Sequence, residues 1–251
     1  HAWCPLAVVE TAAGLHVDAV GLFLLVLALW LAARREGAPG RGSALAQAAS
    51  VMLKGPALFT VPLFVARGGW RFLGVFLLAC ALLCAPFLGV GTQMFTGVGF
   101  YFKYWETNSS LFYLLHSLLD LLTGVRTRGG FTPVVAEHFA IVRGVTTAAL
   151  LMFLVWLIRR RRPGMEWLIG AAFAMLAANL LLNAPTLPWY VIWTVPLLCW
   201  WVIPGWVVFT FTVFVQYYAR WIYPEWYPLP LLWGYLPVYL LLIGQWAWGR
   251  R

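Results

Sequence analysis

The chain has 251 residues and a formal net charge of +9, with 63% hydrophobic and only 10% charged residues. A soluble globular domain contains about 45–50% apolar and about 25% charged residues, so this composition excludes soluble globular, disordered and nucleic-acid-binding proteins. The apolar residues form continuous runs that approach or exceed the ~20 residues needed to cross a bilayer as a helix. The composition therefore predicts an all-α, polytopic membrane protein.

In chain order, seven apolar runs are predicted to cross the membrane as helices. The predicted spans are 18–33, 70–90, 139–158, 165–183, 189–203, 206–222 and 231–248. The segment 45–66 is also apolar, but Lys54-Gly55-Pro56 interrupts it, which favours a re-entrant pair of half-helices over a crossing. The polar stretch 91–138 is predicted to be an external loop in which Leu111–Leu122 forms an amphipathic helix on the membrane surface. Together these elements are expected to form a single transmembrane domain, 1–251.

The basic residues indicate how these spans are oriented. Eleven of the 17 Lys and Arg residues flank the predicted helices on one side: Arg34, Arg35, Arg41, Arg67, Arg71, Arg159, Arg160, Arg161, Arg162, Arg250 and Arg251. The positive-inside rule makes this side cytoplasmic, and it includes the C-terminus. Six of the 8 acidic residues fall on the opposite side: Glu10, Asp18, Glu106, Asp120, Glu137 and Glu225. Because acidic residues contribute little to topology, we expect this excess to mark an external active site.

The first candidate site lies at the external end of the span 18–33. It consists of Glu10, His16 and Asp18. Imidazole and carboxylate groups can together bind a divalent cation or orient a sugar hydroxyl. His16 and Asp18 are two positions apart and would face different sides of a continuous helix, so a shared metal would need a further ligand. A catalytic role and a polar helix cap at the membrane interface both stay open for this cluster.

The second candidate site is the aromatic and polar segment Tyr101–Ser110 of the external loop. Aromatic rings stack on the C–H faces of sugars, while carboxylate, amide and ammonium groups bind hydroxyls and phosphates. The predicted substrate-binding residues of this segment are Lys103, Trp105, Glu106 and Asn108. This mixture favours a phosphorylated sugar as the ligand, with an ordinary interfacial aromatic belt as the alternative.

The third candidate site is the turn Asn183–Tyr190, whose prolines end one helix and begin the next. Trp189 and Tyr190 could face a substrate cavity or belong to an aromatic belt. Arg143 and Arg220 lie near the external ends of predicted spans, where a guanidinium group could pair with a phosphate or extend to lipid headgroups. These four residues complete the predicted substrate-binding set.

In their order along the chain, these motifs resemble those of the bacterial GT-C glycosyltransferases. The resemblance rests on Trp3-Cys4-Pro5 with Glu10, Gly14-Leu15-His16-Val17-Asp18, Leu53-Lys54-Gly55-Pro56, the loop around Trp105 and Asn108, and Pro188-Trp189-Tyr190 followed by Trp193 and Pro196. It spans nearly the whole chain and is greatest with the polyprenyl-phosphate-mannose-dependent mannosyltransferases and their family 87 relatives. His16-Val17-Asp18 differs from the His-Asn-Asp that is commoner in that group.

The resemblance implies a hexosyltransferase of the bacterial inner membrane. Such an enzyme moves a mannose-like sugar from a polyprenyl-phosphate donor to a glycan or lipid acceptor on the extracytoplasmic face. It implies catalytic roles for Asp18, Glu10 and His16. Cations near the leaving phosphate would stabilise its growing negative charge, and Lys103, Arg143 and Arg220 are the candidates. The family's general base lies in an external loop that would precede this sequence, so we expect a longer protein with an N-terminal part. A divalent cation is the one cofactor that the residues suggest.

Two other functions stay open from the sequence. A transporter or flippase for a lipid-linked or small polar substrate would share the broken helix at Lys54-Gly55-Pro56, although the sequence contains no visible internal repeat. A non-catalytic membrane subunit would need neither the external acidic residues nor the aromatic loop. An acidic residue in an external loop upstream of His1 would favour the enzyme.

Overall fold

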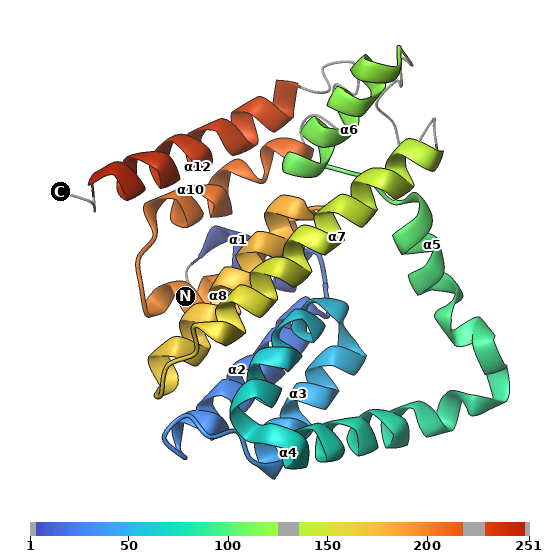
Figure 1. Ribbon diagram of the computed structural model, residues 1–251, viewed down its shortest axis with the longest axis vertical. Helices are drawn as coiled ribbons and strands as arrows, with labels where there is room; N and C mark the ends of the chain where they lie inside the picture. Colours follow the sequence, from blue (N-terminus) through green and yellow to red (C-terminus); the bar gives the residue numbers. More distant parts are fainter. Residues whose placement is uncertain (1–3, 125–135, 218–228, 249–251) are drawn as a thin grey trace. The chain divides into compact units, whose positions relative to one another are not determined.

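The computed structural model describes residues 4–124, 136–217 and 229–248, and in these ranges the chain is built from helices (Figure 1). Four helical stretches are long and apolar enough to cross a membrane: Gly55–Tyr101, Glu137–Arg159, Met165–Leu182 and Leu231–Trp248. They correspond to the predicted spans 70–90, 139–158, 165–183 and 231–248. The predicted all-α class is confirmed, and the described ranges contain four candidate membrane-spanning helices.

The other three predicted spans correspond to shorter helices. α2 (Asp18–Ala33) has 16 residues, and it rises about 24 Å, less than the ~30 Å thickness of the hydrocarbon core. α9 (Pro188–Val191) passes into the 3₁₀ segment Ile192–Cys199, in which Pro196 lacks the amide hydrogen that an α-helix needs. α10 (Pro204–Thr212) ends well before its predicted boundary.

The chain divides into two compact units. The first unit comprises His1–Gly14, Lys103–Ala148 and Leu180–Arg251, and the second comprises Leu15–Phe102 and Ala149–Asn179. Two further helices contribute residues to both units: α7 (Ala136–Arg159) and α8 (Met165–Leu182). Each unit has its own buried apolar side chains, such as Phe112 in the first and Leu25 in the second.

In the second unit, three helices lie side by side (Figure 1). They are α2, α3 (Arg41–Leu53) and the start of α4 (Val61–Cys84). Two serines of α3 connect it to the backbone of α2, since Ser43 Oγ donates to the Ala28 carbonyl and Ser50 Oγ donates to the Gly21 carbonyl, both at 2.6 Å. Small residues at the contact and hydroxyl groups that bond across it are typical of helices packed in membranes, where apolar surface alone does not drive association.

The predicted break at Lys54-Gly55-Pro56 is observed. α3 ends at Leu53, and Lys54 has an extended backbone (φ −157°, ψ 133°) before the 3₁₀ segment Gly55–Thr60 begins. Across this turn, Gln47 Nε2 of α3 donates to Thr60 Oγ1 at 2.8 Å. Pro56 explains the break, because proline has no amide hydrogen and clashes with the preceding turn of a helix.

The second arm of this hairpin ends at Gly69, whose φ of +66° interrupts α4. Glycine adopts this left-handed backbone without the steric penalty of a Cβ atom. Two residues earlier, Arg67 Nε donates to the Gly37 carbonyl at 3.1 Å. The predicted segment 45–66 therefore folds back to the residues that precede α3, and the predicted span 70–90 begins directly after the kink. After the kink, α4 continues into the 3₁₀ segment Ala85–Phe95 and α5 (Thr96–Tyr104).

The first unit contains α1 (Pro5–Val8) with its π-helical continuation Val9–Ala13, α6 (Leu111–Thr123), the start of α7, the end of α8, α9, α10 and α12 (Leu229–Trp248). α10 packs closely on α12 at Gly205. A Cβ atom at this position would lie only 2.9 Å from Leu242 Cγ, so the absence of a side chain permits the close contact. A cluster of buried apolar residues connects α6 with α7: Phe112, Phe139, Val142 and Ala184.

α6 corresponds to the predicted helix Leu111–Leu122, and its polar residues lie on the buried side of the helix. Phe112, His116 and Asp120 recur every four residues and are all buried, whereas Leu121 is 78% exposed. Residues four apart share one face of a helix, so the polar face turns into the protein and the leucine face turns outward. An exposed leucine face is suited to contact with lipid.

Candidate functional site

Two of the three candidate sites lie side by side in the first unit. Thr186 N donates to the Thr107 carbonyl at 2.9 Å, and Thr107 N donates to the Ala184 carbonyl at 3.2 Å. These bonds form a short parallel bridge between the external loop and the turn. Asn108 Nδ2 adds a hydrogen bond to the Thr186 carbonyl at 3.0 Å. The structure thus joins two segments that were each predicted to contribute substrate-binding residues.

The loop is buried and is also bound to α12. Tyr235 OH donates to the Asn108 carbonyl at 2.7 Å, and the hydroxyl groups of Ser110 and Tyr239 share a hydrogen bond. Asn108 is 6% exposed and has a φ of +48°, a conformation that asparagine adopts more readily than most residues. Asn108 was predicted to bind substrate, and here its side chain and carbonyl hold the loop in place.

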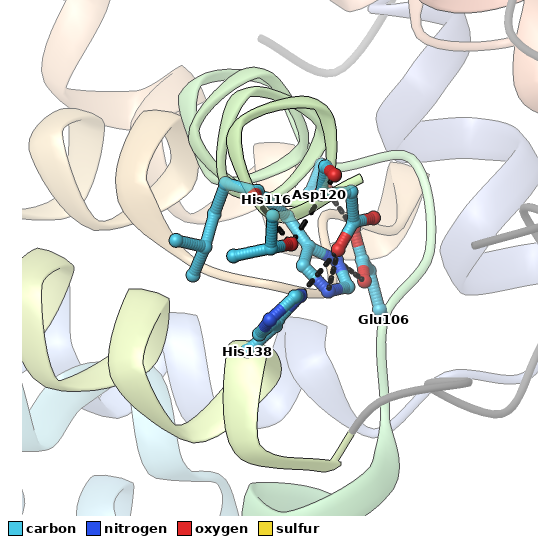
Figure 2. A network of polar contacts seen from close by, with 7 residues as sticks. Glu106, His116, Asp120 and His138 are labelled. Atoms are coloured by element: carbon cyan, nitrogen blue, oxygen red, sulfur yellow. Dashed lines mark hydrogen bonds and ion pairs between the residues drawn. The ribbon is translucent and has the colours of Figure 1, made fainter. Parts of the chain in front are cut away.

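Four titratable side chains form a buried chain of contacts beside this loop, which we call the acid–base chain (Figure 2). Glu106 Oε2 lies 3.1 Å from His116 Nδ1, and Glu106 Oε1 accepts a hydrogen bond from Ser109 Oγ at 3.1 Å. His116 Nε2 lies 3.9 Å from Asp120 Oδ1, and the same oxygen lies 2.6 Å from His138 Nδ1. Carboxylates and imidazoles thus alternate, with each side chain at most 11% exposed.

Three elements supply the acid–base chain. His116 and Asp120 are on one face of α6, His138 is in the first turn of α7, and Glu106 is in the loop. Aromatic rings flank His116, since the ring centroids of Phe112 and Phe139 lie 6.2 and 6.4 Å from the imidazole centroid. Apolar surroundings exclude water, and this strengthens the attraction between the charged groups.

The hydrogen bond with Glu106 raises the pKa of His116 above its ordinary value. Burial acts in the opposite direction, and the negative charges of Glu106 and Asp120 add to the increase in pKa. The contacts therefore favour the imidazolium form of His116, which is attracted to a carboxylate on each side.

We expect the stability of the folded protein to decrease as the pH rises above the ordinary histidine pKa of ~6.5. A group with a raised folded-state pKa, such as His116, stabilises the protein fully below its unfolded-state pKa, and this stabilisation is lost as the pH rises through the folded-state pKa. Unfolding temperatures measured in detergent from about pH 6 to about pH 9 would test this. His116→Gln should weaken the dependence, and an unchanged slope in that variant would contradict the role of His116.

Arg143 of α7 lies beside the same loop. Its guanidinium carbon is 4.8 Å from the ring centroid of Phe139 and 5.8 Å from that of Phe112, and Nη2 donates to the Trp105 carbonyl at 3.4 Å. A guanidinium group keeps its charge in such an aromatic setting, where the ring faces attract it. The structure thus brings Arg143 to Trp105, two residues that were predicted to bind the same substrate.

The predicted residues Trp189, Tyr190 and Glu10 also belong to the first unit. The rings of Trp189 and Tyr190 are half-buried, with centroids 6.0 Å apart and planes at 77°. Glu10, in the π-helical segment, is 1% exposed. The Tyr217 hydroxyl lies 3.0 and 3.1 Å from its two carboxylate oxygens and donates a hydrogen bond to them. Glu10 is therefore stabilised by a partner that the sequence did not predict.

His16 and Asp18 belong to the second unit. Asp18 begins α2 and is fully buried, and its Oδ2 lies 3.1 Å from Lys54 Nζ, whose side chain is 28% exposed. This ion pair connects the start of α2 to the turn of the helical hairpin. His16 is half-buried. The catalytic roles predicted for His16 and Asp18 stay predictions.

The positions of two predicted substrate-binding side chains lie outside the residues that the structure describes. Lys103 is in α5, but its side chain lies outside the described residues, as does the whole of Arg220. For the suggested divalent cation, the described parts of the chain contain no group of three or more His, Cys, Asp or Glu side chains placed to bind a metal.

His116 and His138 were not predicted as site residues from the sequence, and Asp120 was predicted only to lie on the external side. Because the leucines around His116 and Asp120 indicated an interfacial helix, the polar face of α6 was not recognised as part of a site. The available signal was the spacing of His116 and Asp120, four residues apart in an apolar run, because ionisable groups in such runs usually face the protein interior.

These observations define an all-α protein whose described residues include four candidate membrane-spanning helices and a buried acid–base chain. No protein-family model matches the sequence, and no curated protein and no solved structure is significantly similar to it. Its function is therefore inferred from its own residues.

Proposed function

We propose that the protein is a GT-C-like membrane glycosyltransferase. It moves a mannose-like hexose from a polyprenyl-phosphate donor to a glycan or lipid acceptor on the extracytoplasmic face of the bacterial inner membrane. The observation that carries this proposal is the acid–base chain, because it lies directly beside the aromatic loop that was predicted to bind a phosphorylated sugar. Acid–base groups and sugar-binding groups are together what a hexosyltransferase needs.

In this reaction, acid–base catalysis is needed at the acceptor hydroxyl. The acceptor oxygen forms a bond to the anomeric carbon as its proton passes to a base, and the bond from that carbon to the phosphate oxygen breaks. Polyprenyl phosphate leaves as a weakly basic anion, so the leaving group needs little help from an acid. The enzyme must therefore supply a general base for the acceptor hydroxyl.

His138 is the proposed base. Its Nδ1 lies 2.6 Å from Asp120 Oδ1, and donation from Nδ1–H to the carboxylate leaves Nε2 as the nitrogen that can accept a proton. Asp120 then stabilises the imidazolium that forms. Glu106 and His116 extend the same chain of contacts to the loop. With this assignment, the general base is a residue that the structure describes.

The leaving phosphate requires positive charge nearby, because its negative charge grows as the glycosidic bond breaks. Arg143 is the proposed cation, since it lies beside the loop with its guanidinium group against two aromatic rings. Lys103 and Arg220 are further candidates from the sequence, and Trp105, Trp189 and Tyr190 are candidates for stacking on sugar.

In the proposed topology the chain crosses the membrane seven times, with the helical hairpin dipping in from the cytoplasmic side. The arginines on both flanks of the hairpin support this placement. The C-terminus is then cytoplasmic, and the loop with the acid–base chain is external.

We expect a cysteine at Thr123 to react with an impermeant thiol reagent from outside intact cells, and a cysteine at Pro163 to react only after the membrane is opened. Both positions are exposed in the structure, so a lack of reaction reports sidedness and not burial. The variants need a background without the native cysteines Cys4, Cys80, Cys84 and Cys199. Reaction of the Pro163→Cys variant in sealed cells would contradict the proposed orientation.

A transporter or flippase is the second candidate function. The observation that favours it is the buried Asp18, paired with Lys54 at a break between helices, because broken helices with buried charges are common at transport sites. This candidate needs no base beside the loop and forms no glycosidic bond.

The test uses membrane vesicles from cells that produce the protein, supplied with a radiolabelled polyprenyl-phosphate hexose. The proposed function requires the label to enter an acceptor and polyprenyl phosphate to be released in equal amount. Vesicles without the protein are the control. Movement of the labelled lipid across the bilayer without a new glycosidic bond would contradict the enzyme and support the transporter.

A further inference from the structure

Three arginine-bearing segments of the second unit pack on one another, and we call them the arginine cluster. They are 34–41, 66–71 and 159–166. Arg67 connects them, because its Nε donates to the Gly37 carbonyl and its Nη1 donates to the Arg162 carbonyl, both at 3.1 Å. Arg161 Nη1 donates in turn to the Ala66 carbonyl at 3.0 Å. Hydrogen bonds from arginine side chains to backbone carbonyls thus hold the three positively charged segments together.

Glycines allow this close packing. Gly37 has a φ of +79°, and a Cβ atom there would lie 3.0 Å from the backbone of Gly164 and from the Arg67 guanidinium. At Gly68 a Cβ atom would lie 2.9 Å from the Pro39 carbonyl oxygen. Real Cβ contacts are rarely this short, so glycine is required at both positions.

The cluster carries an excess of positive charge that the described protein does not balance. Its nine arginines are Arg34, Arg35, Arg41, Arg67, Arg71, Arg159, Arg160, Arg161 and Arg162. Glu36 and Glu166 are its acidic residues, which leaves a net charge of +7. In the described parts of the chain, no carboxylate lies within ion-pair distance of these arginines. All of them except Arg67 are exposed and accessible to an anion.

Two tryptophans indicate the depth of the cluster in a membrane. Arg34 lies 4.9 Å from the ring centroid of Trp30 near the end of α2, and Arg160 lies 4.8 Å from that of Trp156 near the end of α7. Both tryptophans are about half exposed, at 51% and 47%. Tryptophan at the end of an apolar helix prefers the level of the lipid headgroups, which is also the level of lipid phosphates.

We infer that the arginine cluster is a binding site for anionic phospholipid headgroups. Guanidinium groups bind phosphate through paired hydrogen bonds, and basic clusters beside membrane helices attract acidic lipids. The inference does not depend on the proposed glycosyl transfer. It requires only that the second unit meets a membrane with its arginines at headgroup level.

The test measures lipid binding to the purified protein in detergent. Cardiolipin, phosphatidylglycerol and phosphatidylcholine are added separately, and retained lipid is counted by native mass spectrometry. Both anionic lipids should bind in preference to phosphatidylcholine. Replacing four exposed arginines together, as Arg34→Gln, Arg35→Gln, Arg71→Gln and Arg160→Gln, should weaken anionic lipid binding by about fivefold for each charge that contacts a phosphate. The side chains of these four arginines donate no hydrogen bond to the described backbone, so the variant should fold.

The matched control changes charge in the opposite direction. Glu36→Gln with Glu166→Gln should strengthen anionic lipid binding and leave phosphatidylcholine binding unchanged. Equal retention of all three lipids, or the same anionic preference in the four-arginine variant, would overturn the inference. A further arm adds inorganic pyrophosphate, and displacement of the lipid at equal phosphate concentration would assign the site to a free phosphate ligand and overturn the lipid assignment.

Discussion

Replacing His138 with glutamine should lower hexose transfer by about 10²–10⁴-fold, the range typical of a general base. His138 Nδ1 lies 2.6 Å from Asp120 Oδ1. Glutamine can donate a hydrogen bond to that oxygen but lacks a second nitrogen that accepts a proton. The effect should fall on kcat, with little change in KM for the donor. Transfer from a radiolabelled polyprenyl-phosphate hexose, measured beside the yield of folded protein, separates lost chemistry from lost folding.

The matched control is Thr123→Val on the same helix. Thr123 is exposed, and its hydroxyl donates to the backbone carbonyls of Leu119 and Asp120 within α6. Because it contacts neither the Asp120 carboxylate nor His138 in these bonds, its loss should leave transfer close to the wild-type rate. Asp120→Asn should resemble His138→Gln, because an amide neither enforces the correct imidazole tautomer nor stabilises the imidazolium. Wild-type kcat and wild-type folded yield in both site variants would remove His138 and Asp120 from the mechanism.

Replacing Lys54 with methionine should reduce the free energy of unfolding by about 3 kcal/mol, since removal of one partner leaves a buried charge poorly compensated. Asp18 is fully buried and Lys54 is 28% exposed, so the lower end of the usual range applies. Unfolding of the purified protein in detergent, followed by circular dichroism, measures the loss.

The double variant Lys54→Met with Asp18→Asn tests whether the two side chains act as a pair. It should be more stable than Lys54→Met alone, because a neutral amide costs less to bury than a carboxylate that has lost its lysine. If the two changes add independently, the ion pair contributes nothing and the assignment is wrong. The single variant Asp18→Asn also tests its predicted catalytic role, which requires slower hexose transfer at normal folded yield.

Several features of the fold could be predicted from sequence because they depend on neighbouring residues. Composition and run length indicated apolar helices, since a helix satisfies its own backbone hydrogen bonds in lipid. Proline and glycine at Lys54-Gly55-Pro56 indicated the break after α3, and the apolar run Leu111–Leu122 indicated α6. The predicted start of the span 70–90 agrees with the kink at Gly69, whose positive φ is known only from the structure.

The sequence could not determine which side chains meet across the fold. Glu106, His116, Asp120 and His138 become one chain of contacts only when the loop, α6 and α7 pack together. The pairing of Asp18 with Lys54 likewise requires α3 to pack along α2. Leucine spacing shows that a helix is amphipathic but not which face is covered, because in a membrane either lipid or protein can cover an apolar face. Helices arise from local bonds, whereas a site arises from the packing of elements that are distant in sequence, and only the tertiary structure decides that packing.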